Sequence, residues 1–169
     1  MQRLVRGGSS HRKFLRQIFV CVDITAPLYW WKEFDTYKIG TVANSTSTMH
    51  KLATTPIFEG LFENNGEHLT RQERDFMDYL EHLRQEYLKT KDKAIWKRLI
   101  RNLPESWCQT RTVTMSYENI RNIVNQRENH KLTEWSNDFI DWAKTLPYAD
   151  KLIFYCNSNQ PRLCGPEFK

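Results

Sequence analysis

A change of hydrophobic period early in the chain constrains the fold more than any other sequence feature. Ile18–Ile24 is a short run rich in β-branched residues, which is typical of a buried strand. Pro27 then suits a first helical position, and Trp30 and Phe34 recur at helical spacing in a stretch that reaches Lys38. We therefore expect a strand that leads directly into an aromatic-rich helix.

The rest of the chain alternates between helical patterns and less regular segments. A second strand is expected at Thr110–Met115, where threonines alternate with larger side chains, and Ile39–Thr55 is expected to be a long loop because it is rich in Gly, Ser, Thr and Asn. Cap residues and apolar periodicity predict further helices behind Thr70, from about Asp92 to Pro104, from Ser116 towards Asn129, and behind Thr133. Helices therefore outnumber strands, and the predicted fold class is α+β.

Length and composition predict one globular domain. The chain has 169 residues, 40% of them hydrophobic, so a core can form without a metal or disulfide. We expect a single domain over residues 1–169, with a partly irregular tail at 150–169. No run approaches the ~20 apolar residues that a membrane helix needs, and residues 1–16 lack the apolar centre of a secretory signal. These features predict a cytoplasmic protein without a membrane partner.

The four cysteines do not predict a metal site. None forms a C-x-x-C pair or has zinc-ligand spacing. Cys21 lies in the first strand pattern, where a buried, inert thiol is expected. Cys156 and Cys164 are expected to stay reduced in a chain without an export signal.

Basic charge is unevenly distributed and suggests an anionic partner. The net charge is +5, and residues 1–22 carry five bases and no acid. Residues 59–92 hold nine acids against five bases, whereas residues 93–131 hold eight bases against three acids. Separate basic stretches can bind an anionic small molecule, although a solvated face is the simpler interpretation for most single side chains. Nucleic acid is the weaker expectation, because basic charge alone is non-specific.

Two polar segments are candidate phosphate sites. Gly7–Ser10 can form a nest of backbone amides, although it matches neither a P-loop nor a dinucleotide fingerprint and also resembles an ordinary linker. The hydroxyl-rich loop that contains Ser45 and Thr46 follows Tyr37 and Lys38, which lie at the end of the aromatic helix. These residues can bind a phosphate or a base, or the hydroxyls can satisfy only their own backbone.

Arg127 and His130 lie one helical turn apart and can point to one side. Arginine suits bidentate phosphate binding and histidine can donate or accept a hydrogen bond, but a surface pair at a helix end would look the same. No nucleophilic triad, paired-carboxylate site or metal cluster emerges from the sequence. Catalytic residues are therefore unknown at this stage.

Ile24–Lys38 and the loop behind it resemble the flavin-dependent thymidylate synthases. In that family a strand and an Ala-Pro-like turn lead into a helix that ends in Arg-His-Arg, and a Ser follows after seven further residues. Here the three motif positions are Thr36, Tyr37 and Lys38, and the Ser position is Thr46. The resemblance covers residues 7–52 and 96–146, and it implies a thymidylate-synthase-X-like fold with helices packed on a small sheet.

The resemblance also assigns possible roles to three other residues. His11 matches the family's His before the first strand, Arg127 matches an Arg that contacts deoxyuridylate, and His130 falls on or near a His beside the flavin. Because the family builds its sites between subunits, the resemblance implies a homotetramer. The candidate nucleotide-binding residues are therefore His11, Tyr37, Lys38, Ser45, Thr46, Arg127 and His130.

The altered motif changes what the resemblance implies about activity. Thr36 and Tyr37 cannot supply the charges of the family's motif, and Lys38 does not reproduce the arginine fork. Each lost charged contact weakens binding by roughly 1.5–3 kcal/mol. We therefore expect a protein that binds a nucleotide or a nucleotide-derived signal with a degenerate active site and without a resident cofactor.

Two alternatives stay open. The first is a divergent enzyme that uses FAD to methylate deoxyuridylate. The second is a non-catalytic sponge that sequesters cyclic-nucleotide or ADP-ribose-type signals.

Overall fold

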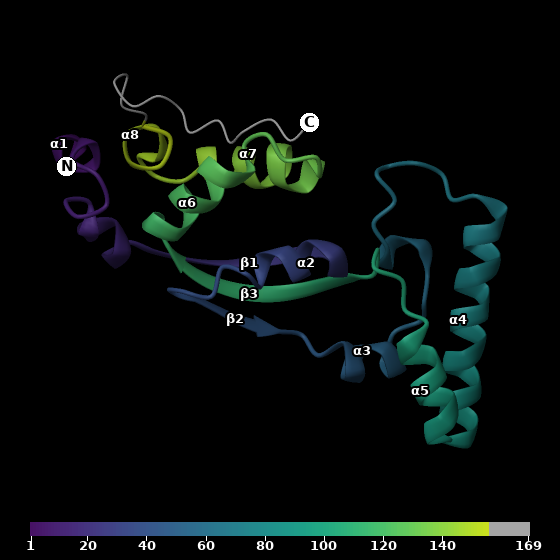
Figure 1. Cartoon of the computed structure of the whole chain (residues 1–169). Coiled ribbons are helices and arrows are strands. Elements are labelled where there is room, and N and C mark those ends of the chain that lie inside the picture. The colour runs from purple at the N-terminus through teal and green to yellow at the C-terminus, as the bar shows by residue number, and fades with distance from the viewer. Residues whose placement is uncertain (156–169) are drawn as a thin grey trace, which may run out of the picture. The chain divides into compact units, whose positions relative to one another are not determined.

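The structure, a computed structural model, describes residues 1–155, whose helices and strands are labelled in Figure 1. The chain divides into two compact units. We call them the terminal unit, which comprises Met1–Val20, Ile39–Thr41 and residues 114–155, and the central unit, which comprises Cys21–Lys38 and Val42–Val113. The single domain expected from the sequence stays a prediction.

A small antiparallel sheet joins three strands in the order β1-β3-β2. The strands are β1 (Phe19–Pro27), β2 (Thr41–Ser45) and β3 (Cys108–Ser116). Side-chain hydrogen bonds report the register of β1 on β3: the hydroxyls of Thr25 and Thr110 lie 2.8 Å apart, and the Thr112 hydroxyl donates to Asp23 Oδ1 at 2.5 Å. Opposite residues on one sheet face therefore pair polar groups with each other.

The helices of the central unit pack around an aromatic and aliphatic core. They are α2 (Leu28–Phe34), α3 (Thr48–Thr54), η2 (Glu59–Leu61), α4 (Arg71–Thr90) and α5 (Lys93–Arg101). The predicted helix start behind Thr70 is confirmed and forms a capping box, in which the Thr70 side chain accepts from the Glu73 amide and the Glu73 carboxylate accepts from the Thr70 amide. Figure 1 shows α4 and α5 side by side. Their contact contributes to a buried cluster of Leu52, Ile57, Phe62, Leu80, Leu83, Leu99 and Trp107.

One buried charge pair fastens α4 to the chain before it. Arg84 is 4% exposed and donates from Nε and Nη2 to the two Glu81 oxygens at 2.7 and 2.6 Å, and from Nη1 to the Ala53 carbonyl at 3.0 Å. Glu81 also accepts from the Ile57 amide at 2.8 Å and from Gln85 at 2.7 Å. Chiefly because of the hydrogen bond from Arg84, the pKa of Glu81 falls from 4.5 to about 2.

The terminal unit is mainly helical. Its elements are α1 (Gln2–Arg6), η1 (Lys13–Gln17), α6 (Tyr117–Arg127), the π-helical turn η3 (Glu134–Phe139), α7 (Ile140–Lys144) and α8 (Ala149–Leu152). Trp135, Ile120 and Ile123 are fully buried in its core. The buried Tyr117 hydroxyl donates to the Pro147 carbonyl at 2.9 Å, and burial raises the pKa of Tyr117.

The expected boundaries of the first strand and helix need correction. The strand continues to Pro27, and its side chains alternate between exposed and half-buried, so Cys21 is exposed rather than buried. The helix ends at Phe34 instead of reaching Lys38. The Thr36 hydroxyl donates to the Glu33 carbonyl at 2.7 Å and satisfies an acceptor of the last turn.

The expected loop at Ile39–Thr55 was wrong, because this segment contains β2 and α3. Strand β2 is almost entirely exposed, so its side chains show no apolar alternation, and its pairing with β3 determines its conformation. The tail, predicted to be partly irregular at 150–169, begins within α8, which ends at Leu152. Cys156 and Cys164 lie outside the described residues.

Candidate functional site

Tyr37 and Lys38 follow α2 in the central unit. Tyr37 is half-buried, and its ring contacts Phe34 with the centroids 6.4 Å apart. Lys38 is exposed, and its ammonium group has no hydrogen bond or ion pair with any residue between 1 and 155. Lys38 is therefore a cation that the described fold does not use.

Ser45 and Thr46 differ in how far their polar groups are used. Both the amide and the hydroxyl of Thr46 donate to the Thr110 carbonyl, at 3.0 and 2.9 Å. Both polar groups of Thr46 are therefore used to hold the chain after β2 against β3. Ser45 ends β2 and is exposed. Because Thr46 pairs with Thr110, the antiparallel register sets Ser45 opposite Arg111 on the next strand.

Arg111 is a further candidate for ligand binding, and it was not among the residues predicted from the sequence. Its guanidinium carbon lies 4.3 Å from the centroid of the buried Trp31 ring, and Nη1 donates to Asp35 Oδ1 at 2.7 Å. Nε donates to Gln109 Oε1 at 2.9 Å. Stacking and hydrogen bonds on several sides hold the guanidinium in one place. The signal in the sequence was a single cation in the middle of an alternating strand.

Arg127 and His130 are brought together by Trp135 in the terminal unit. The Arg127 guanidinium carbon lies 4.9 Å from the Trp135 ring centroid, and the His130 ring lies 6.5 Å from it at 75°. His130 Nδ1 accepts from the Leu132 amide at 3.2 Å, so the neutral ring carries its proton on Nε2. Both side chains therefore lie against one ring, and their binding role stays a prediction.

His11 lies in a folded loop of the terminal unit. The amides of His11 and Arg12 both donate to the Gly8 carbonyl at 3.1 Å, so these two amides are unavailable for the phosphate nest expected nearby. Gly8 has φ +87°, a left-handed conformation that favours glycine. A Cβ at Gly7 would lie 2.9 Å from His11, because the imidazole packs on the Gly7 backbone.

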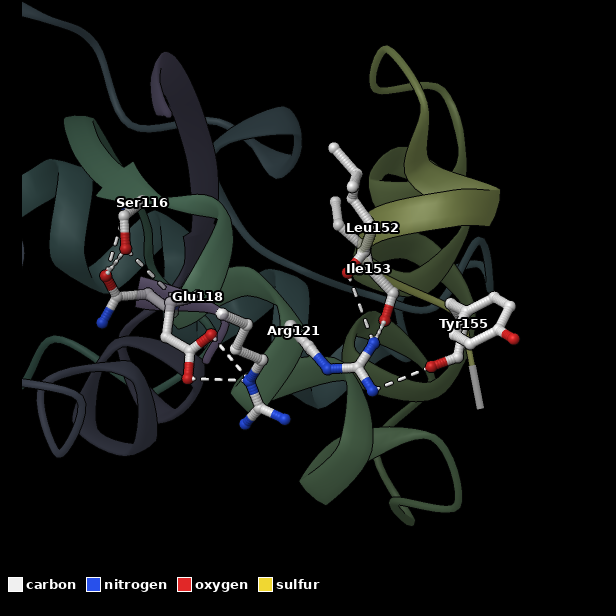
Figure 2. Close-up of polar contacts among 8 residues, drawn as sticks. Ser116, Glu118, Arg121, Leu152, Ile153 and Tyr155 are labelled. Carbon is white, nitrogen blue, oxygen red and sulfur yellow. Dashed lines mark hydrogen bonds and ion pairs between the residues drawn. The ribbon is translucent and has the colours of Figure 1, made fainter. Parts of the chain in front are cut away.

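Arg12 and Glu118 form an ion pair that sequence reasoning also missed. Arg12 Nε donates to both carboxylate oxygens of Glu118, at 2.9 and 3.1 Å, and the two side chains are 17% and 9% exposed. Figure 2 shows the Glu118 carboxylate with both contacts. The nearby N-terminus of α6 is closed by its own capping box, in which Ser116 and Asn119 exchange hydrogen bonds.

Arg121 fastens the end of α8. Its Nη1 donates to the carbonyls of Leu152 and Ile153 at 3.3 and 2.6 Å, and Nη2 donates to the Tyr155 carbonyl at 2.8 Å (Figure 2). These carbonyls belong to the last turn and the residues after it, where helices leave acceptors unsatisfied. Arg121 is therefore accounted for as a cap of the C-terminal helix.

The seven predicted residues thus fall into two groups. Tyr37, Lys38, Ser45 and Thr46 belong to the central unit, and His11, Arg127 and His130 belong to the terminal unit. No group of three His, Cys, Asp or Glu side chains that could hold a metal ion occurs in the part of the chain that the structure describes. Among the helices between residues 1 and 155, none is both long enough and apolar enough to span a membrane.

No protein-family model matches the chain, and no curated protein matches it. Among solved structures, the chain is similar to Thymidylate Synthase X (ThyX) from Helicobacter pylori with FAD and dUMP, with a TM-score of 0.65 and 16% identity over 90% of this chain and 78% of that chain. Flavin-dependent thymidylate synthase ThyX from Helicobacter pylori, in a further structure with FAD and dUMP, gives a TM-score of 0.58 and 14% identity over 88% of this chain and 83% of that chain.

A UMP/dUMP methylase, PolB from Streptomyces cacaoi bound with 5-Br UMP, gives a TM-score of 0.54. Its identity is 13%, over 89% of this chain and 88% of that chain. At such low identity the likeness establishes the fold alone. The expected α+β, thymidylate-synthase-X-like fold is confirmed, and the oligomeric state stays a prediction.

Proposed function

We propose that this protein binds a nucleotide, or a nucleotide-derived signal, through a phosphate group. The observation that carries the proposal is the fold likeness over 90% of the chain to a protein solved with FAD and dUMP. The cations and hydroxyls of the candidate residues suit a phosphate-bearing ligand. In the central unit we assign Tyr37, Lys38, Ser45 and Thr46 to nucleotide binding. In the terminal unit we assign His11, Arg127 and His130 to it.

The residues at the family's motif do not fit FAD in the way that Arg-His-Arg would. Thr36 carries no charge, and its hydroxyl already donates to the Glu33 carbonyl. Tyr37 is uncharged as well, so Lys38 is the one cation among the three motif positions. We therefore propose a protein without a resident flavin and without thymidylate synthase activity.

Calorimetric titration with dUMP, UMP and deoxyuridine tests the proposal. We expect measurable binding of at least one nucleotide, and weaker binding of deoxyuridine because it lacks the phosphate. Arg127→Ala should reduce the affinity about tenfold or more, since one charge-assisted hydrogen bond contributes roughly 1.5–3 kcal/mol. Arg3→Ala is the matched control, because Arg3 is exposed and has no partner in residues 1–155. Unchanged affinity in Arg127→Ala would exclude this residue from the site.

A divergent flavin-dependent thymidylate synthase is the second candidate function. It is favoured by the fold likeness to the Helicobacter pylori structures, which were solved with FAD and dUMP. The visible absorption spectrum after incubation with FAD and removal of unbound cofactor separates the two functions. A stoichiometric flavin band together with rescue of a thymidine-requiring strain would establish the enzyme. A folded protein that retains no flavin favours nucleotide binding without this chemistry.

A sponge for nucleotide-derived signals is a variant of the same proposal. It predicts that the ligand is recovered intact after the complex is denatured, whereas a hydrolase would release a product. We also propose a homotetramer in the cytoplasm, and sedimentation analysis of the purified protein tests the assembly.

A further inference from the structure

The Arg12–Glu118 pair leaves most of the arginine's hydrogen-bonding capacity unused. Both carboxylate oxygens of Glu118 accept from the single Nε–H of Arg12. The Nη1 and Nη2 groups, which carry four of the five guanidinium donors, have no hydrogen bond within residues 1–155. The Glu118 carboxylate therefore holds the guanidinium at Nε. We call the remaining pair of nitrogens, Nη1 and Nη2, the fork of Arg12.

We propose that Arg12, held in position by Glu118, binds a phosphoryl group through its Nη1–Nη2 fork. Two parallel N–H donors in one plane match two oxygens of a phosphate, which is the geometry of bidentate arginine–phosphate contacts. The fork is pre-organised, because the Nε contacts already restrict a side chain that would otherwise lose rotamer freedom on binding. Pre-organisation of this kind increases affinity without adding a new contact.

The charge around Arg12 also favours an anion. Glu118 offsets the charge of Arg12, but the neighbouring residues of the chain carry further cations and no acid before Asp23. Lys13 and Arg16 are exposed and have no ion pair in the described residues. Their field attracts an anion to the terminal unit, although at physiological salt it acts over only about 8 Å.

A purely structural role would look different from what Arg12 shows. Arg121, on the same helix as Glu118, donates from Nη1 and Nη2 to three carbonyl oxygens of the chain. An arginine that serves only to neutralise buried Glu118 would be expected to engage the carboxylate through two nitrogens. Arg12 uses one nitrogen for this purpose, and its fork remains for a ligand.

The ligand class is a phosphomonoester or a diphosphate, such as the phosphate end of a nucleotide. In naming a nucleotide the inference rests on the proposed function, but the fork itself requires only the phosphoryl group. Inorganic pyrophosphate therefore tests the fork separately from the nucleotide.

The test compares the wild type with Arg12→Lys by calorimetric titration with dUMP, deoxyuridine and pyrophosphate. Lysine keeps the charge and can still pair with Glu118, but it has no fork. We expect affinity for dUMP and pyrophosphate to fall at least about tenfold. Arg16→Lys is the matched control and should stay within about twofold, because Arg16 is exposed and the substitution keeps its charge.

A second variant guards against misfolding. Arg12→Gln with Glu118→Gln replaces the charged pair by a neutral pair that can still hydrogen-bond, and it should lose phosphate affinity while its melting temperature reports an intact fold. If Arg12→Lys bound dUMP and pyrophosphate as tightly as the wild type, the proposed role of the Arg12 fork would be wrong, and the proposed nucleotide binding would be unaffected. Pyrophosphate binding that depends on Arg12, without binding of any nucleotide, would support the fork and remove the proposed function. Absence of binding to every phosphate would overturn both.

Discussion

Arg84 in the central unit and Arg12 in the terminal unit each pair with a glutamate, but within residues 1–155 only Arg84 uses its whole guanidinium. Arg84 donates from all three nitrogens, to both Glu81 oxygens and to the Ala53 carbonyl. Arg12 donates from Nε alone in the described part of the chain. The same two residue types therefore build a closed network in one unit and an open one in the other.

The difference separates arginines that hold the fold from arginines that can bind a ligand. Without Arg84, the Ala53 carbonyl and the Glu81 carboxylate would lose the donor that they share. We therefore expect removal of Arg84 to lower the free energy of unfolding. Removing the fork of Arg12 costs no hydrogen bond inside residues 1–155, so its cost should appear in ligand affinity. Lys38, which has no partner there, extends the comparison to a cation that the described fold does not use at all.

The largest effect on stability is expected at Arg84. Arg84→Met keeps much of the side-chain length but removes every donor, and we expect the free energy of unfolding to fall by about 3 kcal/mol, as is usual when one partner of a buried ion pair is lost. Urea denaturation measures the loss. Arg74→Met, at an exposed position of the same helix without a described side-chain partner, is the control and should change stability by less than about 0.5 kcal/mol. A loss below about 1 kcal/mol at Arg84 would break the comparison.

Acid should weaken the central unit through the same network. The pKa of Glu81 is about 2 in the folded protein, below its ordinary value of 4.5, chiefly because Arg84 donates to the carboxylate. The stabilisation is therefore complete above about pH 5 and is lost as the pH falls towards 2. We expect a contribution of about 2 kcal/mol after allowing for the partial exposure of Glu81.

Urea midpoints at pH 7, 5, 4 and 3 test this dependence. Glu81→Gln should lower stability at pH 7 and flatten the decrease between pH 5 and 3. Glu67→Gln, at an exposed carboxylate without a described side-chain contact, should leave the decrease unchanged. An unaltered slope in Glu81→Gln would assign the acid sensitivity to other groups.

A matched pair of substitutions then compares the two arginines directly. Arg84→Lys should destabilise by about 2 kcal/mol, because one ammonium group cannot reproduce a planar fork that serves three acceptors. Arg12→Lys should cost about 1 kcal/mol or less, because lysine can replace the single Nε contact with Glu118. Thermal or urea unfolding of both variants measures the difference. Equal losses would show that Arg12 is as fully committed to the fold as Arg84.

Local patterns predicted the elements whose signals lie within a few residues. The cap residues Thr70 before α4 and Ser116 before α6 were predicted correctly, because their hydrogen bonds join residues three positions apart. The strand at Thr110–Met115 was also predicted and is two or fewer residues short at each end. Strand β2 was missed because its exposed residues owe their conformation to β3, far away in the sequence.

The same limit applies to the candidate sites. Arg12 pairs with Glu118 across 106 residues, and Arg111 pairs with Asp35 across 76 residues, so neither partner can be recognised by spacing. Arg127 and His130 could be grouped in advance, because both lie near one end of α6. Sequence spacing could not identify Arg12 and Lys38 as the cations whose donors are unused within residues 1–155, because this depends on contacts made only in the folded chain.

The smallest effect on stability is expected at Lys38. Lys38→Gln removes an exposed charge without a partner in residues 1–155, and we expect the free energy of unfolding to change by less than about 0.5 kcal/mol. If the nucleotide proposal is right, the same variant should bind dUMP several-fold more weakly, and the loss should shrink in high salt because an exposed charge is screened. Lys89→Gln, at an equally exposed lysine, should bind like the wild type. Arg84→Met should therefore show the largest loss of stability and no loss of affinity, whereas Arg12→Lys and Lys38→Gln should lose affinity with little loss of stability. If the variants ranked in the same order for loss of stability and loss of dUMP affinity, the unused donors of Arg12 and Lys38 would have no role in ligand binding.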